Sequence, residues 1–221
     1  MTVGIIFHGI GTPKRELEPD EAAYWVSKDQ FRQVLDLIAA HPSSHDIRIS
    51  FDDSNISDIE IGLPELKTRG LVADFFVLTG RIGQAGSLDA TDIQTLQSDG
   101  MTIGSHGVDH RNWSTLPPAD LTHELADSRA ALEEVCGIPI TTAGIPFGGY
   151  NAAVLRALRK NGYTCAYSSD CGAMNKSAFL RPRASVQGQM RKKDFELLIT
   201  GHLPLKRRLR RLVGMTRKRL F

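Results

Sequence analysis

The feature that most constrains the fold is an alternation of short apolar runs with longer segments of helical periodicity. The apolar runs predict strands at residues 3–8, 46–52, 73–78, 101–105, 140–145 and 163–168, and more weakly at 183–187. The segments between the runs predict helices at about residues 27–40, 60–70, 89–99, 119–136 and 151–161. Strands that alternate with helices form mainly parallel sheets, and a long series of such units favours a closed sheet. We therefore expect an α/β fold, an irregular (β/α) barrel of about seven parallel strands.

Composition predicts one globular domain at residues 1–202 and a basic tail at residues 203–221. The chain has 221 residues, of which 41% are hydrophobic, and this is enough for the core of one barrel. The net charge is only +2, yet residues 203–221 contain eight basic residues and no acidic one. The positive charge is therefore a property of the tail.

The tail has the pattern of an amphipathic helix. Basic residues fill one face, and the apolar residues at helical spacing are Leu205, Leu209, Leu212 and Val213. Such a helix either contacts an anionic membrane or a lipid-linked glycan, or packs on the barrel with its basic face in solvent. Nucleic-acid binding is not expected, because neither an aromatic pattern nor a known motif accompanies the charge.

Signals for secretion or membrane insertion are missing from the sequence. The N-terminal residues lack a basic region followed by a long apolar one, and no apolar run approaches the roughly 20 residues that span a bilayer. The three cysteines form no CxxC pair, and their odd number favours free thiols in a reducing compartment. We expect a cytoplasmic protein, peripheral at the inner face of the membrane if its tail binds there.

Two adjacent aspartates, Asp52 and Asp53, follow the apolar residues 47–51. Adjacent buried carboxylates repel each other and lose hydration, so they need a compensating cation. Consecutive side chains on an extended backbone point apart, which predicts that one aspartate binds a metal and the other faces a substrate. The competing interpretation is a turn or a helix cap.

Two histidines, His106 and His110, follow the predicted strand at residues 101–105. Two imidazoles and one carboxylate leave coordination positions open on a divalent metal, as hydrolytic zinc sites require. By itself the pair is also compatible with ordinary packing. Together with Asp52 and Asp53 at another strand end, it predicts a metal centre.

A third segment, Pro146-Phe147-Gly148-Gly149-Tyr150-Asn151, lies between a predicted strand and a predicted helix. Its proline and glycines expose backbone N–H groups that could hold an oxyanion. The alternative is a plain turn in which Asn151 caps the following helix.

These three segments resemble the motifs of the polysaccharide deacetylase family, also called the NodB-homology domain or carbohydrate esterase family 4. The resemblance is carried by Ser50-Phe51-Asp52-Asp53, Ser105-His106-Gly107-Val108-Asp109-His110 and Pro146-Phe147-Gly148-Gly149-Tyr150-Asn151. Their order and separation are similar to those of the family, and weaker similarity extends from Phe7-His8-Gly9 to about Arg183.

The resemblance implies that Asp53, His106 and His110 bind a divalent metal. Zn²⁺ is the expected ion, with Co²⁺ or Mn²⁺ as alternatives. It also implies that Asp52 is the general base and that the backbone N–H of Phe147 stabilises the oxyanion. Further substrate contacts are expected from Pro146, Gly148 and Tyr150.

The sequence departs from the family pattern at two places. The glycine that usually follows the two aspartates is Ser54, and the arginine that often orients the catalytic aspartate is replaced by Gly144. Arg183 could enter the site in its place, or it could be a surface arginine at the start of a strand. In the family the general acid is often a histidine near the C-terminus, and His202 is the candidate for that role here. His8, at the end of the first strand, is the other candidate, or it is a packed strand-end histidine.

The function that the resemblance implies is metal-dependent hydrolysis of N-acetyl groups on a polysaccharide, oligosaccharide or lipid-linked glycan. One alternative keeps the fold but hydrolyses another carbon–nitrogen bond or an O-acetyl ester. A second alternative is a catalytically degenerate domain that binds glycan, which the replacements at Ser54 and Gly144 would explain.

Overall fold

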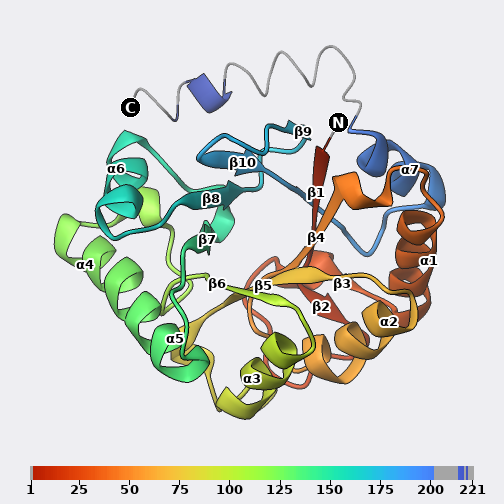
Figure 1. The fold of residues 1–221 in the computed structure, drawn as a ribbon, viewed down its shortest axis with the longest axis horizontal. Helices are drawn as coiled ribbons and strands as arrows, with labels where there is room; N and C mark the ends of the chain where they lie inside the picture. The colour runs from red at the N-terminus through yellow and green to blue at the C-terminus, as the bar shows by residue number, and fades with distance from the viewer. Residues whose placement is uncertain (1, 202–213, 217, 219–221) are drawn as a thin grey trace.

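The computed structural model describes residues 2–201, 214–216 and 218, and within them the main sheet forms a nearly closed barrel. The strand order is β10-β8-β7-β6-β5-β4-β1-β11, and every pairing along it is parallel. The strands are β1 (Thr2–Phe7), β4 (Ile47–Phe51), β5 (Ala73–Val77), β6 (Thr102–Ser105), β7 (Thr142–Gly144), β8 (Cys165–Ser168), β10 (Leu180–Pro182) and β11 (Ala184–Ser185). Helices surround the sheet (Figure 1). The predicted α/β barrel of mainly parallel strands is confirmed.

The barrel is brought close to closure by one extended segment that changes partners at Arg183. β10 pairs with β8 at one edge of the sheet, and β11 pairs with β1 at the other. Between them, the backbone N–H of Arg183 donates to the carbonyl of Ser168 at 2.9 Å, and its own carbonyl accepts from the N–H of Cys171 at 2.9 Å. The strand predicted at 183–187 therefore begins earlier than expected. Arg183 therefore lies between β8 near one edge of the sheet and β1 near the other.

The predicted helices occur close to their expected positions. Within the described residues, the α-helices are α1 (Lys28–Ala39), α2 (Leu63–Thr68), α3 (Ala90–Ser98), α4 (Pro118–Thr122), α5 (Ser128–Cys136), α6 (Ala152–Lys160) and α7 (Lys192–Thr200). The helix predicted at 119–136 is divided by a π-helical stretch at His123–Asp127, and a similar stretch at Asp58–Gly62 leads into α2. α7 is not among the helices that the sequence pattern predicts.

Two short strand pairs lie beside this framework. β9 (Ala173–Met174) pairs antiparallel with β1, and β2 (Gly9–Ile10) pairs with β3 (Trp25–Val26). The chain between β2 and β3 runs past the carboxyl ends of the barrel strands, where residues 18–21 line a cavity.

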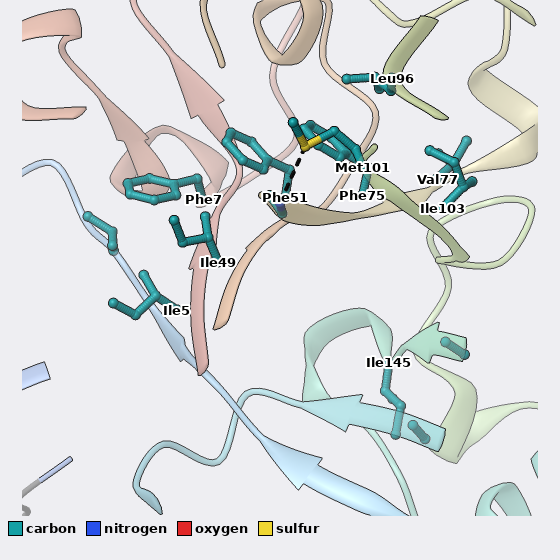
Figure 2. Packing of buried hydrophobic residues seen from close by; sticks show 14 of the residues in the cluster. Ile5, Phe7, Ile49, Phe51, Phe75, Val77, Leu96, Met101, Ile103 and Ile145 are labelled. Carbon is teal, nitrogen blue, oxygen red and sulfur yellow. Dashed lines mark hydrogen bonds between the residues drawn. The ribbon is translucent and has the colours of Figure 1, made fainter. Parts of the chain in front are cut away.

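Phenylalanines packed between the sheet and the helices determine which side of the sheet the neighbouring side chains face. Phe7, Phe51 and Phe75 are direct partners in the register of β1, β4 and β5, and Figure 2 shows them close together. The rings of Phe51 and Phe75 stack at 4.6 Å, and Phe7 meets Phe31 of α1 edge-on at 4.8 Å. Because side chains alternate along a strand, Asp52 points to the opposite side, into the barrel.

Truncation of Phe51 should destabilise the fold strongly. Phe51 is 1% exposed, so Phe51→Ala is expected to lower the free energy of unfolding by about 3–5 kcal/mol, measured by urea denaturation. Val72→Ala is the control, because Val72 is 67% exposed and its truncation should change stability by less than about 0.5 kcal/mol. Equal stability of the two variants would contradict this packing.

The predicted tail lies mostly outside the described residues, which include only 214–216 and 218 from it. Residues 214–216 are helical, and Met215 is buried. Nζ of Lys218 donates to the carbonyl of Gly148 at 3.0 Å and pairs with Asp170 at 2.9 Å. None of the helices in the described part of the chain has the length and apolarity needed to cross a membrane.

Candidate metal centre

The three predicted metal ligands converge at the carboxyl ends of the strands. Asp53 follows β4, and His106 and His110 lie after β6. Nε2 of His106 and Nε2 of His110 each lie 3.3 Å from Oδ1 of Asp53. One nitrogen or oxygen of each residue lies within 4.8 Å of the others. The sequence motifs therefore meet in space, where they line a cavity of about 280 Å³.

This group of atoms fits a divalent metal. Asp53 is 2% exposed, yet its Oδ1 has no hydrogen-bond partner. A buried carboxylate oxygen is normally satisfied, and here two imidazole nitrogens face it instead. Two imidazoles and one carboxylate are ligands that Zn²⁺ and similar ions accept, with positions left open for water and substrate.

Hydrogen bonds on the far side of each imidazole orient the two histidines. Nδ1 of His106 lies 2.8 Å from the carbonyl oxygen of Gly144, which can only accept, so Nδ1 carries the proton and Nε2 is left as the ligand atom. Nδ1 of His110 lies 2.7 Å from Oε2 of Glu18. Partners of this kind fix the tautomer and the ring orientation of metal-binding histidines.

Asp52 is held by a buried arginine. Nη1 and Nη2 of Arg183 contact the two carboxylate oxygens of Asp52 at 2.7 and 2.9 Å, and Nη1 also donates to Oγ of Ser50 at 2.8 Å. Burial by itself raises the pKa of Asp52, but the charge and hydrogen bonds of Arg183 oppose burial, and the net pKa is lowered. Asp52 is therefore an ionised carboxylate fixed in one orientation beside the three ligands.

The segment after β7 forms a tight turn over the cavity. Phe147 has a left-handed backbone with φ 57°, its side chain is 61% exposed, and its ring lies 4.4 Å from that of His110. Phe147 and Gly148 line the cavity. Gly148 has φ 59°, and a Cβ atom there would meet Oγ of Ser169 at 2.3 Å, so the turn favours glycine at this position.

Pro146 and Tyr150 do not line this cavity, although the sequence predicted both as substrate contacts. Both are buried, and the Tyr150 hydroxyl donates to Asp170 at 2.8 Å. Asp170 also accepts from the hydroxyl of Ser168 at 2.7 Å, at the end of β8. Tyr150 is 2% exposed and its hydroxyl bond to Asp170 holds the turn to the end of β8, whereas Phe147 is 61% exposed.

The model for the polysaccharide deacetylase family matches residues 39–166, a range that contains both aspartates, both histidines and the Phe147 turn. The chain belongs to the polysaccharide deacetylase family. The Asp53–His106–His110 group corresponds to the Asp-His-His metal site typical of this family.

Individual members of the polysaccharide deacetylase family resemble this chain over different lengths. YxkH of Bacillus subtilis (strain 168), a predicted polysaccharide deacetylase, is 28% identical over 160 residues, which are 72% of this chain and 54% of that protein. A chitin deacetylase of Pestalotiopsis sp is 30% identical over 129 residues, which are 58% of this chain and 42% of that protein. The chain therefore spans about half the length of the curated relatives it matches.

The barrel also resembles solved structures of deacetylases. The Streptococcus pyogenes deacetylase PplD in complex with acetate superposes with a TM-score of 0.75 at 22% identity, covering 92% of this chain and 98% of that chain. BC0361, a polysaccharide deacetylase from Bacillus cereus, gives a TM-score of 0.76 at 16% identity, covering 90% and 68%. At these identities the likeness shows a shared fold.

Replacement of the family's usual glycine by Ser54 is accommodated within the fold. Ser54 has φ 60°, directly after Asp53 at φ 75°. Its hydroxyl accepts from the N–H of Leu78 at 2.7 Å, and its carbonyl accepts from the N–H of Leu88 at 2.9 Å. These bonds hold a strained left-handed turn that orients Asp53. Ser54 is buried and does not line the cavity, whereas Asp52 does.

Replacement of the family's arginine by Gly144 has a direct counterpart in Arg183. A Cβ atom at Gly144 would meet Cγ of Phe76 at 2.9 Å, Nη2 of Arg183 at 3.1 Å and Nδ1 of His106 at 3.1 Å. The guanidinium of Arg183 therefore already occupies the space beside β7. In this member of the family, the arginine beside Asp52 comes from the junction of β10 and β11.

The two histidines considered as acids differ in what the structure describes. His8 lines the cavity, its ring lies 4.9 Å from that of Tyr24, and its Nδ1 has no hydrogen-bond partner. Burial lowers the pKa of His8, against the opposing charges of Asp53 and Asp52. His202 lies outside the described residues.

Glu18 and Arg81 are site residues that sequence reasoning missed. Glu18 lies in an irregular loop and Arg81 ends the short 3-10 turn Thr79–Arg81, and neither belongs to a recognisable motif. Only the folded chain brings them to the metal centre. Oε1 of Glu18 pairs with the guanidinium of Arg81, which reaches the carbonyl of Asp53 at 3.5 Å.

Proposed function

We propose that this chain is a metal-dependent deacetylase that hydrolyses N-acetyl groups of a polysaccharide, an oligosaccharide or a lipid-linked glycan. The observation that carries the proposal is the buried Asp53–His106–His110 group, whose unpaired carboxylate oxygen lies beside a second carboxylate, Asp52. Membership of the polysaccharide deacetylase family supports an acetylated glycan as the substrate.

Asp53, His106 and His110 would hold the metal, for which Zn²⁺ is our first choice and Co²⁺ or Mn²⁺ are alternatives. Once bound, such an ion polarises the acyl carbonyl and lowers the pKa of water. Asp52 accepts a proton from the attacking water, because Arg183 keeps this carboxylate ionised and fixes its direction.

The turn at Phe147 stabilises the negative charge that develops on the acyl oxygen. Its backbone N–H is the donor for this oxygen, and the left-handed conformation of Phe147 fixes the direction of the peptide group. The leaving amine must gain a proton, and His8, which lines the cavity, and His202 are the candidates. The products are acetate and a free amine.

Acetate release tests the proposal. The full chain, loaded with Zn²⁺, is expected to release acetate from chito-oligosaccharides, and His106→Ala is expected to abolish that activity by removing a ligand. An O-acetylated glycan serves as a second substrate and separates amide from ester hydrolysis. A metal-loaded protein that releases acetate from neither substrate would contradict the proposal and favour a degenerate glycan-binding domain.

The predicted membrane contact concerns the tail, residues 203–221. We propose that the enzyme works at the cytoplasmic face of a membrane, where the basic tail meets anionic lipid or a lipid-linked glycan. The full chain is expected to sediment with anionic vesicles at low salt, and removal of residues 205–221 should reduce this binding. Equal sedimentation of both forms would exclude tail-mediated contact.

A further inference from the structure

The loop between β2 and β3 contributes one carboxylate to the metal centre. Glu18 lies in this loop, before the 3-10 turn Glu21–Tyr24, and outside the range 39–166 that the family model matches. Its Oε2 lies 2.7 Å from Nδ1 of His110. The side chain of His110 is 9% exposed and that of Glu18 is 37% exposed, so a partly exposed carboxylate contacts a largely buried imidazole. Both residues line the cavity.

The geometry of this contact suits a metal-bound imidazole. A carboxylate at Nδ1 requires the proton to be on that nitrogen, which leaves the lone pair on Nε2. Nε2 of His110 faces Oδ1 of Asp53 at 3.3 Å. Glu18 therefore selects the tautomer and the ring orientation that ligation needs. His106 has a neutral carbonyl in the equivalent position, so Glu18 places negative charge behind only one of the two histidines.

Contacts on either side of Glu18 hold it in place. Oε1 pairs with Arg81, whose Nη1 approaches the carbonyl of Asp53 at 3.5 Å. The backbone N–H of Glu18 donates to Oε2 of Glu21 at 2.8 Å, and Glu21 is paired with Arg15. The carboxylate is thus linked both to the strand end that carries Asp53 and to its own loop.

We propose that Glu18 is a positioning residue of the metal centre, which strengthens metal binding by orienting His110. The inference rests on the proposed function only in taking Asp53, His106 and His110 as the metal ligands. It assigns a metal-affinity role to a loop that lies outside the motifs of the family.

The test measures metal binding rather than catalysis. Metal-free full chain is titrated with Zn²⁺ against a chromophoric chelator, and Co²⁺-loaded protein is examined by visible absorption. Glu18→Ala is expected to weaken Zn²⁺ binding by about 10–100-fold and to change the Co²⁺ spectrum. Glu18→Gln should retain most of the affinity, because its amide oxygen still accepts from Nδ1. Glu16→Ala is the matched control, since Glu16 is exposed in the same loop.

The outcomes separate this inference from the proposed function. Wild-type affinity and an unchanged Co²⁺ spectrum in Glu18→Ala would overturn the positioning role while leaving the metal site intact. Equal weakening in Glu18→Gln and Glu18→Ala would also overturn it, because orientation through the hydrogen bond would then contribute nothing. A wild-type chain that binds neither ion would overturn the proposed function itself.

Discussion

Replacement of Asp52 by asparagine is expected to reduce acetate release by about 10²–10⁴-fold without loss of the metal. Asparagine has nearly the same shape and still offers an acceptor to Arg183, but it cannot take a proton from water. Turnover of chito-oligosaccharides and the metal content of the same preparation are the two quantities to measure. Asp29→Asn is the control, because the side chain of Asp29 is 86% exposed on α1.

The division of roles between the two aspartates depends on this pair of readouts. Activity lost with metal retained supports Asp52 as the base and Asp53 as the ligand. If Asp52→Asn loses its metal together with its activity, Asp52 is itself a ligand and the division is wrong. Full activity in Asp52→Asn would show that another group accepts the proton.

Replacement of Arg183 by methionine should move the acid limb of the pH–activity profile to higher pH. Burial tends to raise the pKa of Asp52, and Arg183 is the first of the groups that reverse this tendency. Without the guanidinium, Asp52 binds a proton at higher pH and is ionised over a narrower range. Below the pKa, each unit of upward shift reduces the ionised fraction about tenfold, so kcat/KM should fall more at pH 6 than at pH 8.

The same substitution should lower stability near neutral pH. A carboxylate with a lowered native pKa stabilises the fold above its unfolded pKa, and this contribution disappears as the pH falls through the native pKa. Arg183→Met leaves Asp52 buried without its partner, so the free energy of unfolding at pH 7 should fall by about 3–5 kcal/mol. Arg181→Met is the control, since Arg181 lies on β10 and contacts Tyr167 instead. An unchanged pH profile would contradict the pairing of Arg183 with Asp52.

Much of the site could be predicted from the sequence because its parts are local. Asp52, Asp53, His106 and His110 each follow an apolar run, and parallel strands bring their carboxyl ends to one side of the barrel. The turn at Phe147 was equally visible, because proline and glycine mark it. Local sequence patterns were enough to predict these features, without knowing which distant residues are in contact.

The remaining features depend on contacts between distant segments. Glu18 reaches His110 across 92 positions and Arg81 across 63, from a loop with no periodic pattern. The sequence placed Tyr150 beside Phe147 as a substrate contact, but it could not show that Tyr150 turns inward to Asp170. It offered Arg183 as a candidate, but only the change of strand partners explains why this side chain enters the barrel.

The most direct test of the metal centre is equilibrium dialysis of the metal-free full chain against Zn²⁺, with the bound metal quantified by elemental analysis. We expect the wild-type chain to bind a single tightly held ion, and we expect Asp53→Ala and His106→Ala each to lose it while keeping a folded circular dichroism spectrum. Absence of binding by the wild-type chain, or equally tight binding by both variants, would contradict the assignment of Asp53, His106 and His110 as the ligands.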